Sequence, residues 1–320
     1  MGFFKVLFGG KEDSAEEREE KKRENDFDVL KVDGIQAMRI GRYPYAVACL
    51  RKAVEIKEEQ EAHEYLVSAL VRNDDREGAA EELEKLEQLY PEEIKYAVNR
   101  ANVLYEIEEY EMAEQECNKA IKHYPNLAIP YYVLAQISMA REEYQQAENF
   151  ASKAVENNND FLDALQLCAE TKIKNGKLGE AEKDIDILIK REYNLDESLL
   201  LKAKVMEEMD RPNDAITYYN NVLEQNPFMR KAYADLASLY VKMKEMDKAK
   251  KTIEECIEQN GESAEIINAR AALKDAMGDK KGAQEDLEKV IRLTQEDEDI
   301  EDVDIERQVN QQYNSINPFQ

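Results

Sequence analysis

The residue types that most often carry out chemistry are few and scattered in this sequence. Two histidines and four cysteines occur in 320 residues, and no two cysteines form a CxxC pair. A zinc site needs several such side chains close together. The isolated His63 and His123 therefore predict no metal site, and no cofactor is expected. The cysteines are expected to be buried, reduced thiols: Cys49, Cys117, Cys168 and Cys256.

No motif singles out residues for acid–base or nucleophilic catalysis. The chain has 70 Asp and Glu residues, so a pair of carboxylates is uninformative, and no motif places a nucleophile beside a base. Gly9, Gly10 and Lys11 look like the end of a phosphate-binding loop, but Glu12 follows where that motif requires Ser or Thr. We therefore expect a protein that is not an enzyme and has no small-molecule substrate.

The net charge limits the kinds of partner. The formal net charge is −26, whereas nucleic acids and anionic lipids are bound by clustered Lys and Arg. Nucleic acid is therefore not expected as a partner, and membrane contact is the less favoured alternative. No run reaches the roughly 20 apolar residues of a membrane span, and the N-terminus lacks the apolar core of a signal peptide. Together with reduced cysteines, these features predict a cytoplasmic location.

The elements that would position binding residues form a repeat. An alanine recurs at a spacing of 34 residues along most of the chain, with the first alanine one residue out of step. The recurring residues are Ala46, Ala79, Ala113, Ala147, Ala181, Ala215, Ala249 and Ala283. A fixed period of this length is typical of a stacked array in which each repeat contacts its neighbours.

Each repeat is predicted to be a helical hairpin. Between residues 128 and 161, apolar and small residues fall at helical spacing on both sides of a turn near Arg141. A small residue also recurs in the first helix, which lets the two helices approach closely. This set is Gly34, Ala101, Ala135, Ala169, Ala203, Ala237 and Ala271, with Val67 as the exception. Turn-forming residues mark the joints between helices: Gly41, Gly176, Gly278, Pro91, Pro125 and Pro227.

The pattern resembles the tetratricopeptide repeat, in which a Leu-Gly/Ala pair, a Tyr, a central Ala, an aromatic residue, a second Ala and a Pro stand at set offsets. The resemblance covers residues 27–297, as eight repeats beginning near Phe27, Gln60, Ile94, Ala128, Leu162, Asp196, Arg230 and Ala264. It implies an all-α fold, a right-handed α-solenoid of about eight hairpins. Charged residues replace the preferred Leu in four repeats, at Asp33, Arg100, Lys202 and Arg270.

The resemblance also implies a binding surface, because the first helices of this family line a concave groove. At groove positions we predict the partner-binding residues Tyr65, Asn99, Asn102, Tyr105, Tyr132, Gln136 and Gln166, accompanied by Val133, Met139, Leu167, Leu200 and Leu201. Amides can donate to and accept from a peptide backbone, and aromatic faces can take side chains. We expect an extended segment of a protein partner with apolar and basic residues. The alternative is that these are ordinary helix-surface residues.

Co-chaperones of the same family hold a carboxyl terminus with a Lys and an Asn in one repeat, an Asn in the next, and a Lys and an Arg in the third. Here Val98 replaces the first Lys, and Tyr132 and Val133 stand where an Asn is needed. This argues against a receptor for chaperone tails. An adaptor that binds peptides and a structural subunit of a larger complex remain as alternatives.

The N-terminal end differs from the array. Residues 1–10 form an apolar tip that could dock on a partner, contact a membrane, cap the first repeat or remain mobile. The predicted docking residues are Phe3, Phe4, Leu7 and Phe8. Residues 11–26 form a charged spacer, helical or disordered, in which Ser14 and Glu17 have the spacing of a capping box.

The C-terminal end is acidic. Residues 298–314 are predicted to form a capping helix over the last repeat, since an array needs a polar outer face at its end. The alternative is an acidic, partly apolar peptide that another protein binds. Residues 315–320 are predicted to be a flexible tail.

Overall fold

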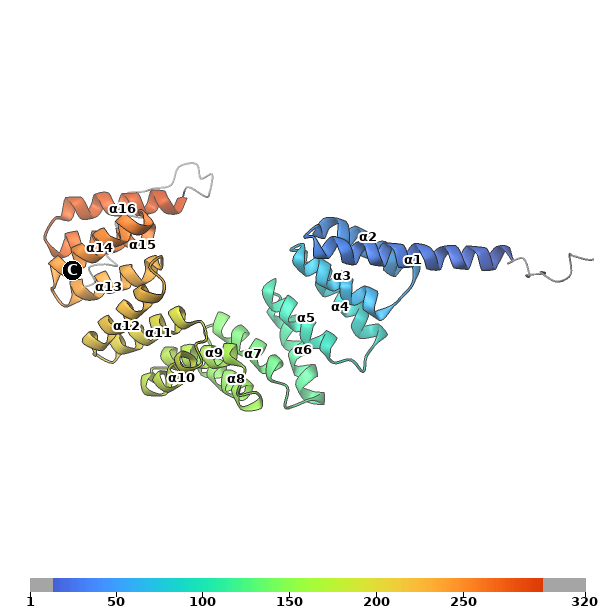
Figure 1. Ribbon diagram of the computed structural model, residues 1–320. Helices are drawn as coiled ribbons and strands as arrows, with labels where there is room; N and C mark the ends of the chain where they lie inside the picture. The colour runs from blue at the N-terminus through green and yellow to red at the C-terminus, as the bar shows by residue number, and fades with distance from the viewer. Residues whose placement is uncertain (1–13, 296–320) are drawn as a thin grey trace, which may run out of the picture. The chain divides into compact units, whose positions relative to one another are not determined.

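The computed structural model describes residues 14–295, and within this range it contains 16 α-helices and no strand (Figure 1). The chain divides into two compact units, Met1–Phe161 and Leu162–Gln320. The all-α prediction with eight helical hairpins is confirmed. The predicted docking residues Phe3, Phe4, Leu7 and Phe8 and the predicted capping helix 298–314 lie outside the described residues.

Each unit holds four hairpins in chain order. The first unit comprises α1 (Ala15–Arg39), α2 (Tyr43–Ile56), α3 (Gln60–Arg72), α4 (Arg76–Leu89), α5 (Lys95–Glu106), α6 (Tyr110–His123), α7 (Ala128–Ala140) and α8 (Tyr144–Asn157). The second comprises α9 (Leu162–Lys174), α10 (Leu178–Lys190), α11 (Leu195–Glu208), α12 (Pro212–Gln225), α13 (Arg230–Lys242), α14 (Met246–Asn260), α15 (Ala264–Ala276) and α16 (Lys280–Gln295). Within a unit, each helix packs against the next, and first helices of successive hairpins also meet, as α5 does with α7 and α13 with α15.

The recurring alanines are the points of closest packing. All eight of them are fully buried. The small residues of the first helices are buried as well, and at Gly34 the reason is visible: a β-carbon there would lie 2.6 Å from Cγ of Leu50 on α2. The helices of this first hairpin are therefore too close for any side chain at Gly34. The prediction that small residues allow close approach is confirmed in the hairpins.

The turn inside each hairpin uses one backbone conformation in all eight repeats. One turn residue has a positive φ, between 56° and 86°, at Gly41, Asp74, Glu108, Glu142, Gly176, Asp210, Lys244 and Gly278. The next residue's N–H bonds a carbonyl five residues back, as Glu143 N does with Ser138 O at 2.8 Å. This is the helix-ending arrangement that favours glycine. Only three repeats have glycine there, so the turn geometry comes from the packed hairpin rather than from the turn residue.

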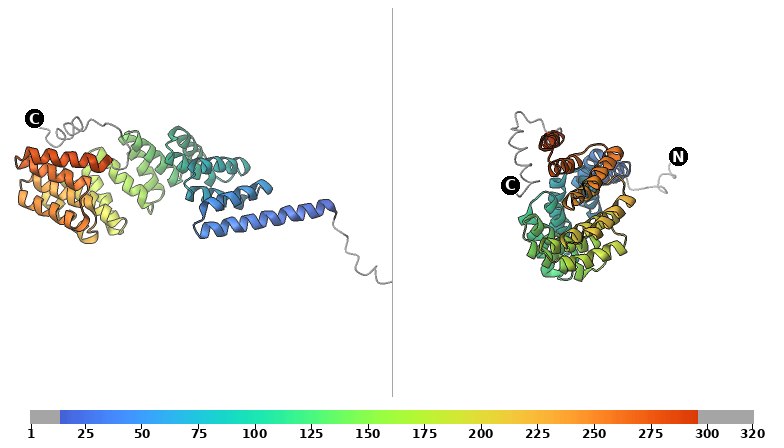
Figure 2. Two further views of the ribbon diagram at one scale, coloured as in Figure 1. Left: turned by 90° about the horizontal axis from the view of Figure 1, so that it is seen from above. Right: turned by 90° about the vertical axis from the view of Figure 1, so that its left-hand side faces the viewer.

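The first helix extends beyond its hairpin. α1 has 25 residues and its partner α2 has 14, and the N-terminal half of α1 projects past the end of α2 (Figures 1 and 2). Its start is fixed by a capping box, in which Ser14 Oγ accepts from Glu17 N and Glu17 Oε2 accepts from Ser14 N. Residues 15–26, treated as a spacer in the sequence, thus continue the first repeat helix.

Candidate functional site

A small pocket opens between the first helices of the second and third hairpins. It has a volume of about 280 Å³ and is lined by Glu64, Val67 and Ser68 of α3, Leu83 and Leu86 of α4, and Lys95, Tyr96 and Asn99 of α5. We call it the α3–α5 pocket. Its apolar lining comes from Val67, Leu83 and Leu86, and polar side chains of α3 and α5 complete it. The arrangement suits a peptide that places one apolar side chain in the pocket and whose backbone meets the polar groups.

Hydrogen bonds hold the polar part of the α3–α5 pocket in place. Tyr96 Oη donates to Glu64 Oε1 at 2.6 Å and accepts from Gln60 Nε2 at 2.7 Å. Lys95 Nζ lies 2.8 Å from the same carboxylate oxygen of Glu64. The bond from Lys95, with that from Tyr96, lowers the pKa of Glu64, and burial together with the bond to Glu64 raises the pKa of Tyr96. Glu64 is therefore a fixed carboxylate at neutral pH.

The two predicted asparagines of α5 differ in what they can offer a partner. Asn99 is exposed and lines the α3–α5 pocket. Asn102 is half-buried, and its Nδ2 donates to the carbonyl of Val98 in its own helix at 3.1 Å. One of its donors is therefore already used. Asn99 is the better placed of the two for hydrogen bonds to a peptide backbone.

Three predicted aromatic residues are half-buried and packed against their own unit. The ring of Tyr132 lies 4.9 Å from that of Phe161, and the ring of Tyr105 lies 5.9 Å from that of Tyr110. Burial, with a smaller contribution from Tyr110, raises the pKa of Tyr105. Tyr65 on α3 packs against the apolar core of the first unit. These rings can still present an edge to a partner, but much of their surface is already used.

The predicted glutamines both have partners within the chain. Gln136 Nε2 donates to Tyr132 Oη at 3.3 Å. Gln166 belongs to the second unit, where its Nε2 donates to Glu170 at 3.0 Å and its Oε1 accepts from Asn194 at 3.5 Å. The structure thus joins Gln136 to Tyr132 and places Asn99 in the pocket, while Gln166 lies in the other compact unit.

Three apolar residues that the family pattern assigned to the groove are buried instead. Val133, Leu167 and Leu200 are each less than a tenth exposed. Their placement at the groove surface was wrong, because branched apolar side chains at these positions pack into the layer between helices. Met139 and Leu201 are half-buried.

Sequence reasoning missed most of the α3–α5 pocket. Glu64, Ser68 and Lys95 occupy groove positions of the family pattern but were passed over in favour of amides and aromatic residues. Leu83 and Leu86 could not have been found that way, because they come from a second helix, α4, which the groove positions do not include. The sequence does contain a signal for this site: polar residues stand at groove positions of two neighbouring repeats, Glu64 and Ser68 in one and Lys95 and Asn99 in the next.

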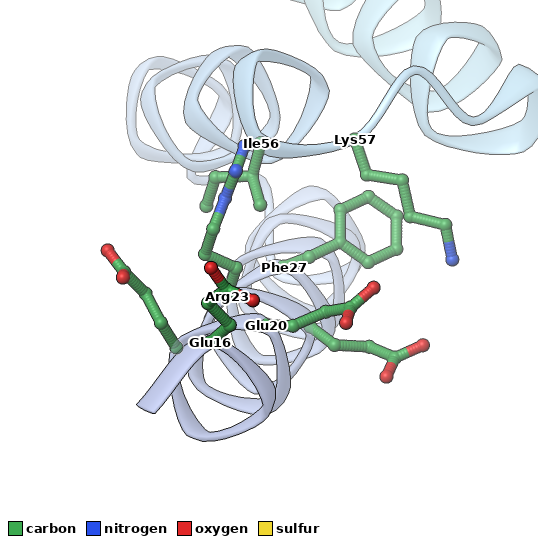
Figure 3. A pocket seen from close by; sticks show the side chains of 8 residues that line it. Glu16, Glu20, Arg23, Phe27, Ile56 and Lys57 are labelled. Atoms are coloured by element: carbon green, nitrogen blue, oxygen red, sulfur yellow. The ribbon is translucent and has the colours of Figure 1, made fainter. Parts of the chain in front are cut away.

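A larger hollow lies where α1 projects beyond α2. It has a volume of about 520 Å³ and is lined by Glu16, Glu19, Glu20, Arg23, Glu24, Phe27, Ile56 and Lys57. Figure 3 shows the Glu16 and Glu20 side chains on α1, with Phe27 and Ile56 at its inner end. Phe27 is almost fully buried, and Lys57 Nζ lies over its ring, 5.1 Å from the centroid. The hollow is therefore acidic, since four of its eight lining residues are glutamates.

A third hollow, of about 460 Å³, lies between α13 and α15 of the second unit. Its lining alternates small and polar residues: Lys231, Ala234, Asp235, Ser238, Glu265, Asn268, Ala269 and Ala272. Its apolar lining comes from three alanines, so this hollow lacks large apolar side chains such as Leu83 and Leu86 of the first unit.

The four cysteines are free and buried, as expected. Burial raises the pKa of Cys117 to about 12, so this thiol is unreactive at neutral pH. Within residues 14–295, no group of three or more His, Cys, Asp or Glu side chains is placed to hold a metal ion. Across the same part of the chain, none of the helices has the length and apolar character needed to cross a membrane.

Comparisons with known proteins agree with this architecture. A family model described as tetratricopeptide repeat matches residues 66–128, and a second of the same description matches residues 207–273. The chain is similar to the Hsp70-Hsp90 organizing protein of Triticum aestivum, with 26% identity over 200 residues, covering 60% of this chain and 33% of that protein. An Hsp70-Hsp90 organizing protein of Glycine max matches with the same identity and covers 60% of this chain and 34% of its own length. The chain thus spans about a third of the length of these relatives.

A solved structure supports the fold. The crystal structure of a tetratricopeptide repeat protein from Parabacteroides merdae superposes with a TM-score of 0.63 at 17% identity, covering 80% of this chain and 99% of that one. At this identity the likeness concerns the fold alone. The alanine spacing, the eight hairpins and the two matched segments lead to the same conclusion: the chain contains tetratricopeptide repeats.

Proposed function

We propose that the chain is a protein-interaction adaptor whose first unit binds an extended segment of a partner protein at the α3–α5 pocket. The observation that carries the proposal is the position of Asn99, an exposed amide beside the apolar residues Val67, Leu83 and Leu86. An amide and an apolar pocket side by side can hold the backbone and one side chain of a peptide.

The size and build of the α3–α5 pocket favour a peptide over a small molecule. Its volume of about 280 Å³ is below the range of about 300–1,000 Å³ that small-molecule sites usually have. Several of its polar groups are already oriented, because Glu64 is held by Tyr96 and Lys95. A preoriented rim lowers the entropy lost when a flexible segment binds.

Charge favours a partner segment with basic residues next to the apolar one. The chain has a net charge of −26, so a basic segment is attracted over a long range and this attraction weakens as salt is added. Close to the pocket, the carboxylate of Glu64 stays ionised because its pKa is lowered. The bonds from Lys95 and Tyr96 both use Oε1 of this carboxylate. We therefore expect the basic residues of the partner to bind at the rim of the pocket.

The similarity to Hsp70-Hsp90 organizing proteins supports a role in protein interaction, but the residues do not favour a chaperone tail as the ligand. Val98, which stands in place of the first lysine of the family's carboxylate clamp, is buried. A ligand that ends in a free carboxylate would therefore lack the first lysine of the clamp, and the nearby Lys95 is already paired with Glu64. We propose an internal, extended segment as the ligand.

The test begins with selection of peptides from a random display library against the full chain. The best peptide is then titrated against the wild type, Asn99→Ala, Asn102→Ala and the matched control Asn118→Ala, an exposed asparagine on α6 that does not line the pocket. One lost hydrogen bond costs about 0.5–1.5 kcal/mol, so we expect about a tenfold weaker Kd for Asn99→Ala. Asn102→Ala and Asn118→Ala should stay within about threefold of the wild type. Equal binding by Asn99→Ala and Asn118→Ala would reject the pocket as the binding site.

A further inference from the structure

The outer face of α1 exposes residues that every other hairpin buries. Val29 is 50% exposed. The residues at the same place in the next seven repeats are all buried: Ala62, Tyr96, Pro130, Ala164, Ser198, Ala232 and Ile266. Gln36 is also exposed, and its counterparts Ala69, Val103, Ile137, Thr171, Val205, Leu239 and Leu273 are all buried. The difference arises because, in the described chain, no hairpin precedes α1.

The exposed residues form one stripe along α1. Val29, Val32, Gln36 and Ile40 follow one another at spacings of three or four residues, which places them on the same side of a helix. Val32 is 49% exposed and Ile40 is 69% exposed. Such large apolar side chains are not needed at a solvated surface, and their alignment indicates a face that another element covers.

The charges of α1 are separated between its two sides. The side that faces the 520 Å³ hollow carries Glu16, Glu19, Glu20 and Glu24 with a single cation, Arg23 (Figure 3). Residues absent from that lining include Arg18 and Lys22, which continue the valine stripe toward the N-terminus at helical spacing. Arg39 flanks the other end. The stripe from Arg18 to Ile40 therefore combines apolar and basic residues within a chain whose net charge is −26.

We propose that the outer face of α1, from Arg18 to Ile40, binds an amphipathic α-helix with acidic flanks that a partner protein supplies. A helix is the shape that fits, because in the later hairpins of the first unit the first helix is covered mainly by the second helix of the preceding hairpin, as α3 is by α2 and α5 by α4. Acidic flanks are the complement of Arg18, Lys22 and Arg39, while apolar residues at spacings of three and four would meet Val29 and Val32.

Two other occupants fit the face less well. Antiparallel pairing of the valines of two copies would bring Lys22 of one copy near Arg39 of the other, and like charges at that distance repel. An anionic membrane would contact a wider strip than a helix does. It would meet the exposed carboxylates of Asp26 and Asp28, which lie beside the stripe on the same helix. A partner helix along the stripe avoids this repulsion when its acidic residues lie at its two ends, next to Arg18, Lys22 and Arg39.

The test uses two designed helical peptides with the same apolar residues, one with glutamates and one with lysines on its flanks. Each is labelled with a fluorophore and titrated into the full chain while anisotropy is recorded. The acidic peptide should bind the wild type at least about tenfold more tightly than the basic one.

Arg18→Glu combined with Lys22→Glu should reverse this preference. Val29→Glu combined with Val32→Glu should weaken binding of the acidic peptide by about tenfold or more, whereas the matched control Ile187→Glu, at a 45% exposed residue of α10, should leave it unchanged.

Several results would overturn the proposal. It fails if the wild type binds both peptides equally, if it binds neither, or if the double valine variant binds like the control. It also fails if the wild type binds vesicles of anionic lipid and the double valine variant does not, because the face would then serve a membrane. Concentration-dependent self-association in sedimentation, lost in the double valine variant, would instead assign the face to a second copy. Thermal midpoints of the variants should match the wild type because the substituted residues are exposed.

Discussion

Arg100 on α5 and Glu116 on α6 form a buried ion pair, with Arg100 Nη1 2.9 Å from Glu116 Oε1 and the Arg100 side chain only 9% exposed. Arg100 stands where the repeat pattern prefers leucine. Two other cations at this place are also paired: Arg270 bonds Asp286 at 2.6 Å, and Lys202, 2% exposed, lies 2.6 Å from Asp186. In each case the acid lies 16 residues before or after the cation. The three cationic departures from the pattern are therefore matched by acids on a neighbouring second helix.

Replacing these cations with the preferred leucine should have opposite results at two sites. Arg100→Leu removes the buried cation from Glu116 and Glu87, both 12% exposed, and leaves them Lys119, which is 51% exposed. We therefore expect a loss of about 2 kcal/mol in the free energy of unfolding. Lys202→Leu leaves Asp186, which is 58% exposed and can be hydrated, and Glu182, which is 24% exposed and keeps Arg211 at 3.4 Å. Stability should therefore change by less than about 1 kcal/mol or rise. Urea denaturation followed by circular dichroism measures both. A larger loss for Lys202→Leu than for Arg100→Leu would contradict the argument.

Acid should reveal opposite roles for Asp286 and Glu116. Burial alone would raise the pKa of Asp286, but bonds from Arg270 and Lys274 hold it below its usual value of 3.8. Its stabilising contribution is therefore complete at neutral pH and is lost as the pH falls below about 4. Burial raises the pKa of Glu116, although Arg100 opposes the shift. Ionisation of Glu116 therefore opposes folding. As the pH falls through the raised pKa, Glu116 takes up a proton and the free energy of unfolding gains a favourable contribution.

The variants Asp286→Asn and Glu116→Gln should therefore show opposite trends with pH. Relative to the wild type, Asp286→Asn should be destabilised at pH near 7, and the difference should shrink in acid. For Glu116→Gln, the free energy of unfolding relative to the wild type should be higher at neutral pH than in acid. Urea midpoints measured at both pH values provide the test, and parallel trends for the two variants would count against the assigned pKa shifts.

Two helical glycines should respond in opposite directions to alanine. At Gly34 the added β-carbon would lie 2.6 Å from Leu50 Cγ, whereas at Gly179 on α10 nothing lies within 4 Å. Gly34→Ala should lower the free energy of unfolding by about 1–3 kcal/mol through overpacking. Gly179→Ala should raise it by about 0.5 kcal/mol, because alanine favours the helix. Urea denaturation measures both changes. Equal urea midpoints for the two variants would show that α1 and α2 can move apart at no cost in stability.

The fold could be predicted from the sequence because its signal is repeated. Seven alanines at one spacing, with an eighth one residue out of step, identify the contacts between paired helices, and all eight are buried. The positive φ of Glu108, Glu142 and Lys244 could not be predicted, since none of these residues favours that conformation. It follows from the hairpin geometry, which the packed alanines and glycine impose.

The candidate site could be predicted only in part. Asn99 lines the α3–α5 pocket, but Val133 was assigned to the groove and is buried. A residue's position in a repeat determines the direction in which its side chain points from the helix axis. How far that side chain is buried depends on the size of the side chains in the next hairpin. Leu83 lines the pocket from α4 next to Val67 and Ser68 and is itself only 1% exposed.

The central claim, that the α3–α5 pocket receives a side chain of a protein partner, is tested most directly by filling the pocket. Ser68 lines it and is exposed, so Ser68→Trp should occupy the space without disturbing the core. The matched control is Ser238→Trp in the hollow of the second unit. The measurement is the Kd of the display-selected peptide by calorimetric titration, with thermal midpoints as a check on folding. We predict at least about tenfold weaker binding for Ser68→Trp and no change for Ser238→Trp. Unchanged binding by a folded Ser68→Trp variant, or a loss confined to Ser238→Trp, would contradict the account.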